Sequence, residues 1–142
     1  MRYLADLDLS LVALQECQHL NDVEVEDVGW DSRYSECRRA AILFRGSWKH
    51  LILDCISGDR WVAIIFRHLV FVSAYLPHRE TCEGKNGEPR GSSEGHYESF
   101  ALYTSVLSDL TSKVLAAKKK YSIRDLVLQV DANVEVYPNQ TV

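Results

Sequence analysis

The sequence lacks an excess of positive charge: 16 lysine and arginine residues stand against 20 aspartate and glutamate residues, a net charge of −4. A protein without an overall basic field does not attract nucleic acid over its whole surface, so a polyanion would need a local basic patch. One candidate patch consists of Arg38, Arg39, Arg45 and Lys49. The lysine run 118–120 is a second candidate, although cations at the end of a helix are also explained by the helix dipole alone.

Long hydrophobic runs are also missing. The longest, residues 61–66 and 69–72, are far too short to cross a bilayer, which takes about 20 apolar residues. Asp6 and Asp8 interrupt the first apolar stretch, which therefore does not have the form of a secretory signal. The cysteines show neither a Cys-x-x-Cys spacing nor a histidine at zinc-finger distance; they are Cys17, Cys37, Cys55 and Cys82. We therefore expect reduced, unligated cysteines, a cytoplasmic or nuclear location and no membrane partner.

The composition that is present, 46% hydrophobic and 25% charged over 142 residues, is that of one globular domain spanning residues 1–142. Short runs rich in Ile, Val, Leu and Phe predict strands. These runs cover residues 10–15, 40–44, 51–56, 61–66, 69–75 and 122–130. Tight connections at 57–60 and 67–68 predict an antiparallel meander. Val23, Val25 and Val28 alternate with acidic residues, which favours a further short, half-exposed strand.

A long amphipathic helix is expected after the loop at 77–95, over residues 97–120, with Ser92 or Ser93 as its cap. Its apolar stripe contains Phe100, Tyr103, Val106, Leu107, Leu110, Val114 and Leu115. A strand, a helix and a second strand in this order form a crossover unit, in which the two strands are parallel and the connection is right-handed. Leucine spacing over residues 3–9 suits the tail of another helix. The pattern as a whole predicts an α/β fold with a mixed sheet.

Two apolar runs end in side chains that bind hard cations. Glu16 follows the first strand, and Asp131 and Asn133 follow the last. Carboxylates suit Mg²⁺ or Mn²⁺, and an amide can orient a phosphate or a water. Tyr75, at the end of a third strand, adds a hydroxyl. Each residue also has a purely structural interpretation: a solvated charge for Glu16, an Asx turn for the Asp-x-Asn pair, and a rim aromatic for Tyr75.

Four segments in order resemble the endonuclease/exonuclease/phosphatase superfamily, which includes abasic-site endonucleases and the endonuclease domains of retroelements. The segments are VALQE at 12–16, RAAILF at 39–44, LVFVSAYLPH at 69–78 and LVLQVDAN at 126–133. The resemblance extends over nearly the whole chain, and the retroelement-type branch is the nearest in its short Tyr-Leu-Pro-His loop.

The resemblance implies a partial four-layer α/β sandwich with two mixed sheets, and Mg²⁺- or Mn²⁺-dependent hydrolysis of a phosphodiester or phosphomonoester, with a phosphodiester preferred. Glu16 falls on the metal-binding glutamate of the family and Tyr75 on its active-site tyrosine. Asp131 falls on the aspartate that helps to bind metal and activate water, and Asn133 on the asparagine that contacts phosphate. The implied partner is a nucleic acid, DNA rather than RNA; an inositol phosphate or lipid headgroup remains an open alternative.

The sequence also departs from the family pattern. Val130 stands where the family has a glycine, and Ala132 where it has a bulky residue. A first strand with a metal-site asparagine and the last strands with an Asp and an Asp-His pair have no counterpart, so the chain corresponds to about two-thirds of such a domain. From this we expect open sheet edges, self-association and little activity. The alternatives are a non-catalytic binding or scaffold remnant, and an unrelated α/β domain if Glu16 and Asp131 lie far apart.

Overall fold

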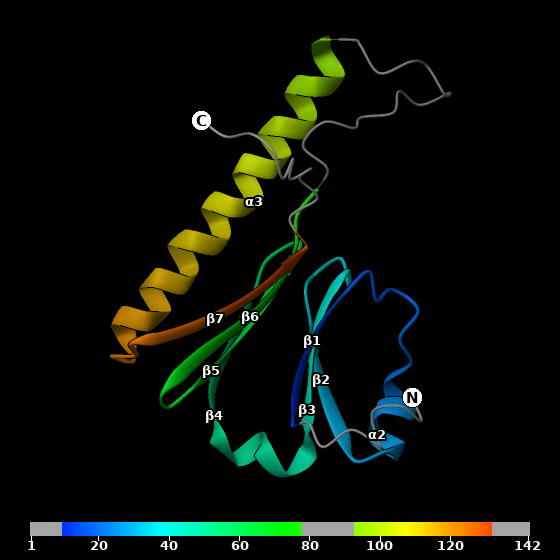
Figure 1. Ribbon diagram of the computed structural model, residues 1–142, viewed down its shortest axis with the longest axis vertical. Coiled ribbons are helices and arrows are strands. Elements are labelled where there is room, and N and C mark those ends of the chain that lie inside the picture. Colours follow the sequence, from blue (N-terminus) through cyan, green and yellow to red (C-terminus); the bar gives the residue numbers. More distant parts are fainter. Residues whose placement is uncertain (1–9, 78–92, 132–142) are drawn as a thin grey trace, which may run out of the picture.

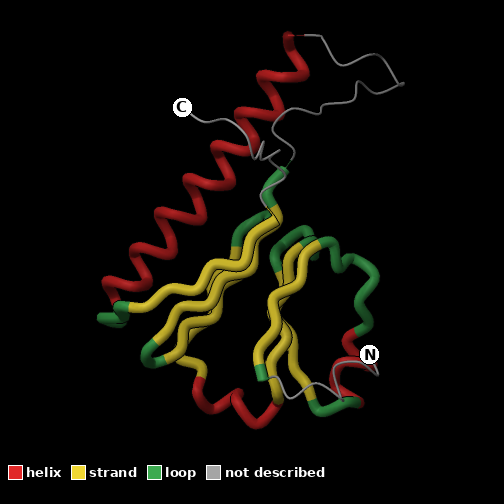
Figure 2. The backbone as a smooth tube through the Cα atoms, viewed as in Figure 1, coloured by secondary structure: helices red, strands yellow, loops and turns green. Residues whose placement is uncertain are grey.

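The computed structural model of the chain describes residues 10–77 and 93–131. Two β-sheets face each other, a long helix covers the outer side of one sheet, and a short helix lies on the outer side of the other (Figures 1 and 2). This helix–sheet–sheet–helix arrangement confirms the predicted α/β fold class. Residues 3–9, with their expected helix tail, lie outside the described residues.

The first sheet has the strand order β1 (Leu11–Gln15), β3 (Ala40–Arg45), β2 (Trp30–Tyr34), and both pairings are antiparallel. The central strand β3 is buried on both faces because it lies between two layers. Ile42 and Phe44 pack toward the other sheet, whereas Leu43 packs with Val25 and Trp30 on the outer face. Continuous apolar sequence in β3 follows from this double burial.

The second sheet has the order β4 (Ile52–Ser57), β5 (Trp61–Phe66), β6 (Leu69–Tyr75), β7 (Asp125–Asp131). The first three strands form the predicted antiparallel meander, and β6 and β7 form the predicted parallel pair. A 3₁₀ helix, η1 (Gly46–Leu51), leads from β3 to β4 and so from one sheet to the other. The parallel pair therefore makes this sheet mixed, whereas the three-stranded sheet is antiparallel throughout.

Helix α3 (Ser93–Lys120) connects β6 to β7 and packs on the four-stranded sheet, and its last turn carries the lysine run 118–120. The helix residues buried in that interface are Val106, Leu110, Val114 and Ala117. The predicted stripe was too wide: Leu107 and Leu115 are 39% and 56% exposed. One helix crossing a twisted sheet makes contact along a narrow line, so its flanking leucines stay in water. Ser93 is the first residue of the helix, whereas the other predicted cap, Ser92, and the side chain of Phe100 lie outside the described residues.

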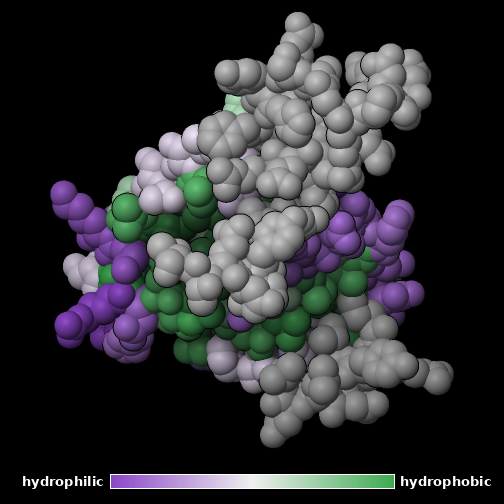
Figure 3. Space-filling view, turned by 45° about the horizontal axis from the view of Figure 1, so that its top comes forward, coloured by the Kyte–Doolittle hydropathy of each residue, from purple (hydrophilic) through white to green (hydrophobic). Residues whose placement is uncertain are grey.

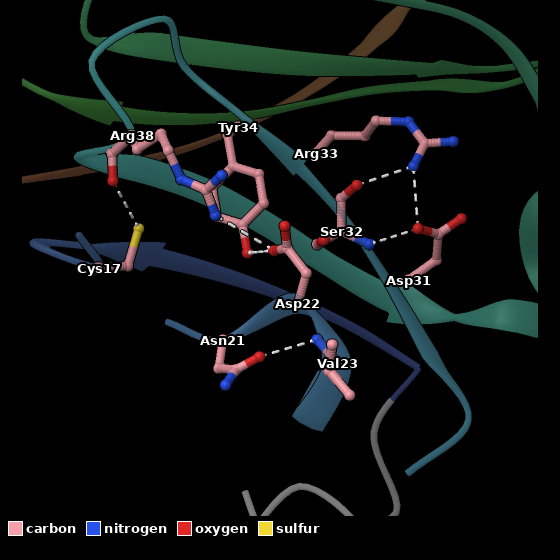
Figure 4. A network of polar contacts seen from close by, with 9 residues as sticks. All are labelled: Cys17, Asn21, Asp22, Val23, Asp31, Ser32, Arg33, Tyr34 and Arg38. Carbon is pink, nitrogen blue, oxygen red and sulfur yellow. Dashed lines mark hydrogen bonds and ion pairs between the residues drawn. The ribbon is translucent and has the colours of Figure 1, made fainter. Parts of the chain in front are cut away.

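The half-exposed strand expected around Val23 is wrong, because this segment forms helix α2 (Asp22–Asp27). Asn21 caps the helix: its side-chain oxygen accepts a hydrogen bond of 3.0 Å from the Val23 N–H (Figure 4). Val25 is fully buried, whereas Val23 is 63% exposed. The alternation of valine with acids imitates a strand, but in a helix of six residues only one valine faces the core.

Strand β7 forms one edge of the four-stranded sheet and is unusually exposed for an apolar strand. Leu126, Leu128 and Val130 remain 41%, 44% and 40% exposed. Figure 3 shows hydrophobic surface lying directly between two strongly hydrophilic regions. Within the described residues, no helix has the length and apolar character needed to span a membrane.

Candidate active site

The carboxyl ends of β1, β6 and β7 lie at the same end of the sandwich (Figure 1). Tyr75 ends β6 and stands directly opposite Asp131 on β7. Glu16 follows β1 of the facing sheet, and its Oε1 accepts a hydrogen bond of 3.1 Å from the Tyr75 hydroxyl. Three of the four residues predicted from the sequence, Glu16, Tyr75 and Asp131, therefore come together. The fourth, Asn133, lies outside the described residues.

The orientation of these side chains follows from the strand register. Side chains alternate between the two faces of a strand, and partners in register share a face. Val70, Val72 and Ala74 pack on the core under α3, so Tyr75 and its partner Asp131 belong to the face directed at the three-stranded sheet. Asp131 is half-buried there. Its main chain is fixed as well, because its carbonyl accepts a hydrogen bond of 2.9 Å from the Leu76 N–H.

A buried polar contact joins the two sheets beneath the site. Ser73, which is 0% exposed, donates from Oγ to the Leu14 carbonyl at 3.0 Å. The same hydroxyl accepts from Gln15 Nε2 at 3.0 Å, and this amide also reaches the Gln129 carbonyl at 3.4 Å. These bonds connect β1, β6 and β7 one residue or two before Glu16, Tyr75 and Asp131. They fix the lateral position of the three strands that carry the site.

Glu16 has a left-handed backbone with φ of 53°. Its N–H still donates to the Arg39 carbonyl at 2.7 Å, so the ladder between β1 and β3 extends one residue beyond the strand. A side chain other than glycine in this conformation costs about 1–2 kcal/mol, and such outliers cluster at functional sites. The strain turns the chain sharply away after β1 and leaves the Glu16 carboxylate at the sheet end.

Two arginines flank this group. Arg60 lies opposite Tyr75, because the Tyr75 N–H donates to the Arg60 carbonyl at 2.9 Å next to the Trp61–Ala74 pair. The Arg60 and Arg39 guanidinium carbons lie 5.9 Å and 5.7 Å from the centre of the Tyr75 ring. Both arginines therefore border the acidic site from the ends of neighbouring strands.

The predicted basic patch divides into two parts. Arg38 and Arg39 lie in the turn between β2 and β3, at the site end, whereas Arg45 is the last residue of β3 at its far end and Lys49 follows in η1. Arg38 pairs with Asp22 at 3.2 Å and stacks on the Tyr34 ring. Arg39 alone of these four contacts a site residue in the described part of the chain.

Cys17 follows Glu16 but is not placed to react. Its side chain is buried, and Sγ donates to the Arg38 carbonyl at 3.4 Å. Burial raises the pKa of this thiol, because desolvation disfavours the thiolate. The sulfur therefore stays protonated and serves as packing rather than as a nucleophile. Cys37 and Cys55 also carry free thiols.

The donor atoms at the site suit a hard divalent cation. Glu16 and Asp131 offer carboxylate oxygens from two facing sheets, and Mg²⁺ takes one or two carboxylates together with waters and phosphate oxygens. Among the side chains that the structure describes, no three from His, Cys, Asp and Glu gather at one point. A cation here would accordingly hold two carboxylates from the described residues and leave its other positions to water and substrate.

Sequence reasoning found the acids and the tyrosine because each stands at the end of an apolar run. It missed Arg60 and did not connect Arg39 to the site. The signal lay in the strand register, since each arginine is the residue that pairs just beyond a strand end with Tyr75 or Glu16. No protein-family model matches this sequence, and no curated protein matches it either.

Proposed function

We propose that this chain is a Mg²⁺- or Mn²⁺-dependent phosphodiester hydrolase domain of the endonuclease type, acting on nucleic acid, with DNA as the preferred substrate. The observation that carries the proposal is the convergence of Glu16, Tyr75 and Asp131 at one end of the sandwich, with the Tyr75 hydroxyl 3.1 Å from Glu16. The resemblance of four ordered segments to the endonuclease/exonuclease/phosphatase superfamily supports the same function.

In this mechanism Glu16 and Asp131 hold the cation, which supplies charge neutralisation at the phosphate when bound. Tyr75 orients the Glu16 carboxylate by its hydrogen bond and places a phenol beside the substrate phosphate. Asp131, with its main chain fixed on β7, accepts a proton from the attacking water. The buried Ser73 contact keeps the strands that carry the two acids in position.

Turnover is expected to be slow. His50 and His68 precede β4 and β6, so they lie at the opposite end of these strands from Tyr75. His19, three residues after Glu16, is exposed and makes no hydrogen bond to Glu16 or Tyr75, so the side-chain contacts described at the site come from a carboxylate and a phenol. Absence of one positioned acid or base typically lowers a rate by about 10²–10⁴-fold.

The test is nicking of supercoiled plasmid DNA at high enzyme concentration, with Mg²⁺, with Mn²⁺ and with EDTA. We expect metal-dependent nicking that Glu16→Gln and Asp131→Asn each reduce by about 10²-fold or more. Glu26→Gln, on the exposed surface of α2, is the matched control and should nick like the wild type. DNA binding that is indifferent to metal, without nicking, would instead favour the scaffold remnant.

A further inference from the structure

We propose that Arg39 and Arg60 form a phosphate-binding pair, which holds the oxygens of a substrate phosphate beside Glu16 and Asp131. The inference rests on the proposed function for its ligand class, a phosphodiester. It adds two residues that the sequence resemblance did not assign to any role. The pair comes from both sheets: Arg39 directly precedes β3, and Arg60 directly precedes β5.

The positions of both arginines are fixed by backbone hydrogen bonds to site residues. The Arg39 carbonyl accepts from the Glu16 N–H at 2.7 Å, and the Arg60 carbonyl accepts from the Tyr75 N–H at 2.9 Å. Directly opposite residues of an antiparallel pair project on the same face. Arg60, Tyr75 and Asp131 therefore form one row across β5, β6 and β7, with a cation at one end and an anion at the other.

Other arginines of this region make short ion pairs, and these two do not. Arg33 pairs with Asp31 at 3.1 Å, and Arg38 pairs with Asp22 at 3.2 Å (Figure 4). Among the described residues Arg39 makes no ion pair, and Arg60 makes only a long one of 3.7 Å with Asp59. Arg60 Nε is buried and has no hydrogen-bond partner there. A buried donor without a partner is unusual enough to indicate a missing ligand.

Charge and shape both suit a phosphate. The two positive charges of the pair offset the negative charges of Glu16 and Asp131 and so reduce the repulsion that a phosphodiester would meet there. Guanidinium groups present a planar fork that matches two phosphate oxygens. Both groups also lie within 6 Å of the Tyr75 ring centre, 5.7 Å and 5.9 Å away, where cation–π attraction limits their motion and so lowers the cost of binding.

The test measures binding without turnover. A fluorescein-labelled DNA duplex of about 15 base pairs, in which every phosphate is a potential ligand, is titrated with the protein in EDTA at several salt concentrations. Arg39→Gln and Arg60→Gln should each weaken binding about tenfold, since a hydrogen bond to a charged group is worth about that factor. Each should also reduce the slope of log affinity against log salt by about 0.9.

Arg38→Gln is the matched control, because Arg38 precedes Arg39 but is already paired with Asp22. It should bind like the wild type. Arg39→Lys and Arg60→Lys, which keep the charge and lose the fork, should show an intermediate loss, and circular dichroism of each variant confirms folding. If folded Arg39→Gln and Arg60→Gln proteins bind both DNA and inorganic phosphate as tightly as Arg38→Gln, the proposal is overturned.

This result is separable from that of the nicking assay. Arginine-dependent binding without any nicking would keep the pair and reject the hydrolase, whereas nicking with arginine-independent binding would do the reverse. Competition by inorganic phosphate shows whether the pair binds a phosphodiester or a free phosphate group. If it binds in an arginine-dependent way and the duplex does not, the pair stands, and its ligand is a free phosphate group instead of a phosphodiester.

Discussion

Removal of the Ser73 hydroxyl should destabilise the fold by an amount that the structure allows us to work out. Ser73→Ala deletes the bond to the Leu14 carbonyl and the bond from Gln15 Nε2, both 3.0 Å long and made at a fully buried residue. The Gln15 amide keeps its 3.4 Å contact with the Gln129 carbonyl, so it is not left wholly without a partner. At about 1 kcal/mol for each lost bond, the expected loss is about 2 kcal/mol.

The loss is measured by urea unfolding followed by tryptophan fluorescence. Unfolding entropy is about 2.1 cal/mol/K per residue, so for 142 residues a loss of 2 kcal/mol lowers Tm by about 7 °C. The slope of unfolding free energy against urea should stay unchanged, because the surface exposed on unfolding is the same. Ser105→Ala, at an exposed position of α3, is the control. A change below about 0.5 kcal/mol for Ser73→Ala would show that the bonds between the sheets contribute no net stability.

Three further predictions concern other parts of the molecule. A Cβ added at Gly58 would overlap the Trp61 indole and lie 2.6 Å from Asp109 Oδ2, which accepts the indole N–H at 3.0 Å. Gly58→Ala should therefore lower the unfolding free energy, measured by chemical denaturation, by about 3 kcal/mol. A loss of less than about 1 kcal/mol would contradict this packing. Burial raises the pKa of the Cys17 thiol, so its alkylation by iodoacetamide, followed by mass spectrometry, should need a higher pH than alkylation of a free thiol. Reaction at the rate of a model peptide near pH 8 would show that the thiol is open to solvent. The wild-type protein should self-associate through β7 as its concentration rises, which light scattering measures. Leu128→Lys should suppress this association, whereas Leu115→Lys, on α3, should not. A wild type that stays monomeric would refute the open edge.

Strands with apolar residues on both faces were predictable from the sequence alone. Runs in β3, β5 and β6 are buried on both faces, so nearly every position is apolar, with Arg45 and Ser73 as exceptions, and the boundaries are sharp. Strand β2 escaped prediction, because its sequence WDSRY is mostly half-buried and its two strand-forming residues, Trp30 and Tyr34, are separated by three polar residues. Only its pairing with β3 makes it a strand, and such a tertiary contact leaves no periodic signal.

The site residues that end apolar runs were predictable from the sequence, whereas the contacts between them were not. Glu16, Tyr75 and Asp131 each follow an apolar run, so their position at strand ends could be read from the sequence. The bond between Tyr75 and Glu16 joins residues 59 positions apart on different sheets, which no local pattern encodes. Arg60 looked like an ordinary turn residue because its relation to Tyr75 depends on the exact register of β5 and β6.

The parallel pairing of β6 and β7 has a consequence for the order in which the protein folds. Neighbouring strands β4, β5 and β6 are joined by short turns and can pair early, whereas Leu69 meets Asp125 only after the intervening chain has closed. Contacts so distant in sequence form late. Because Asp131 is carried by β7, we expect the acidic pair to be completed late, and the edge of β6 that pairs with β7 to stay exposed until then. We therefore expect recovery of the site, and not of the sheet core, to limit the rate of refolding.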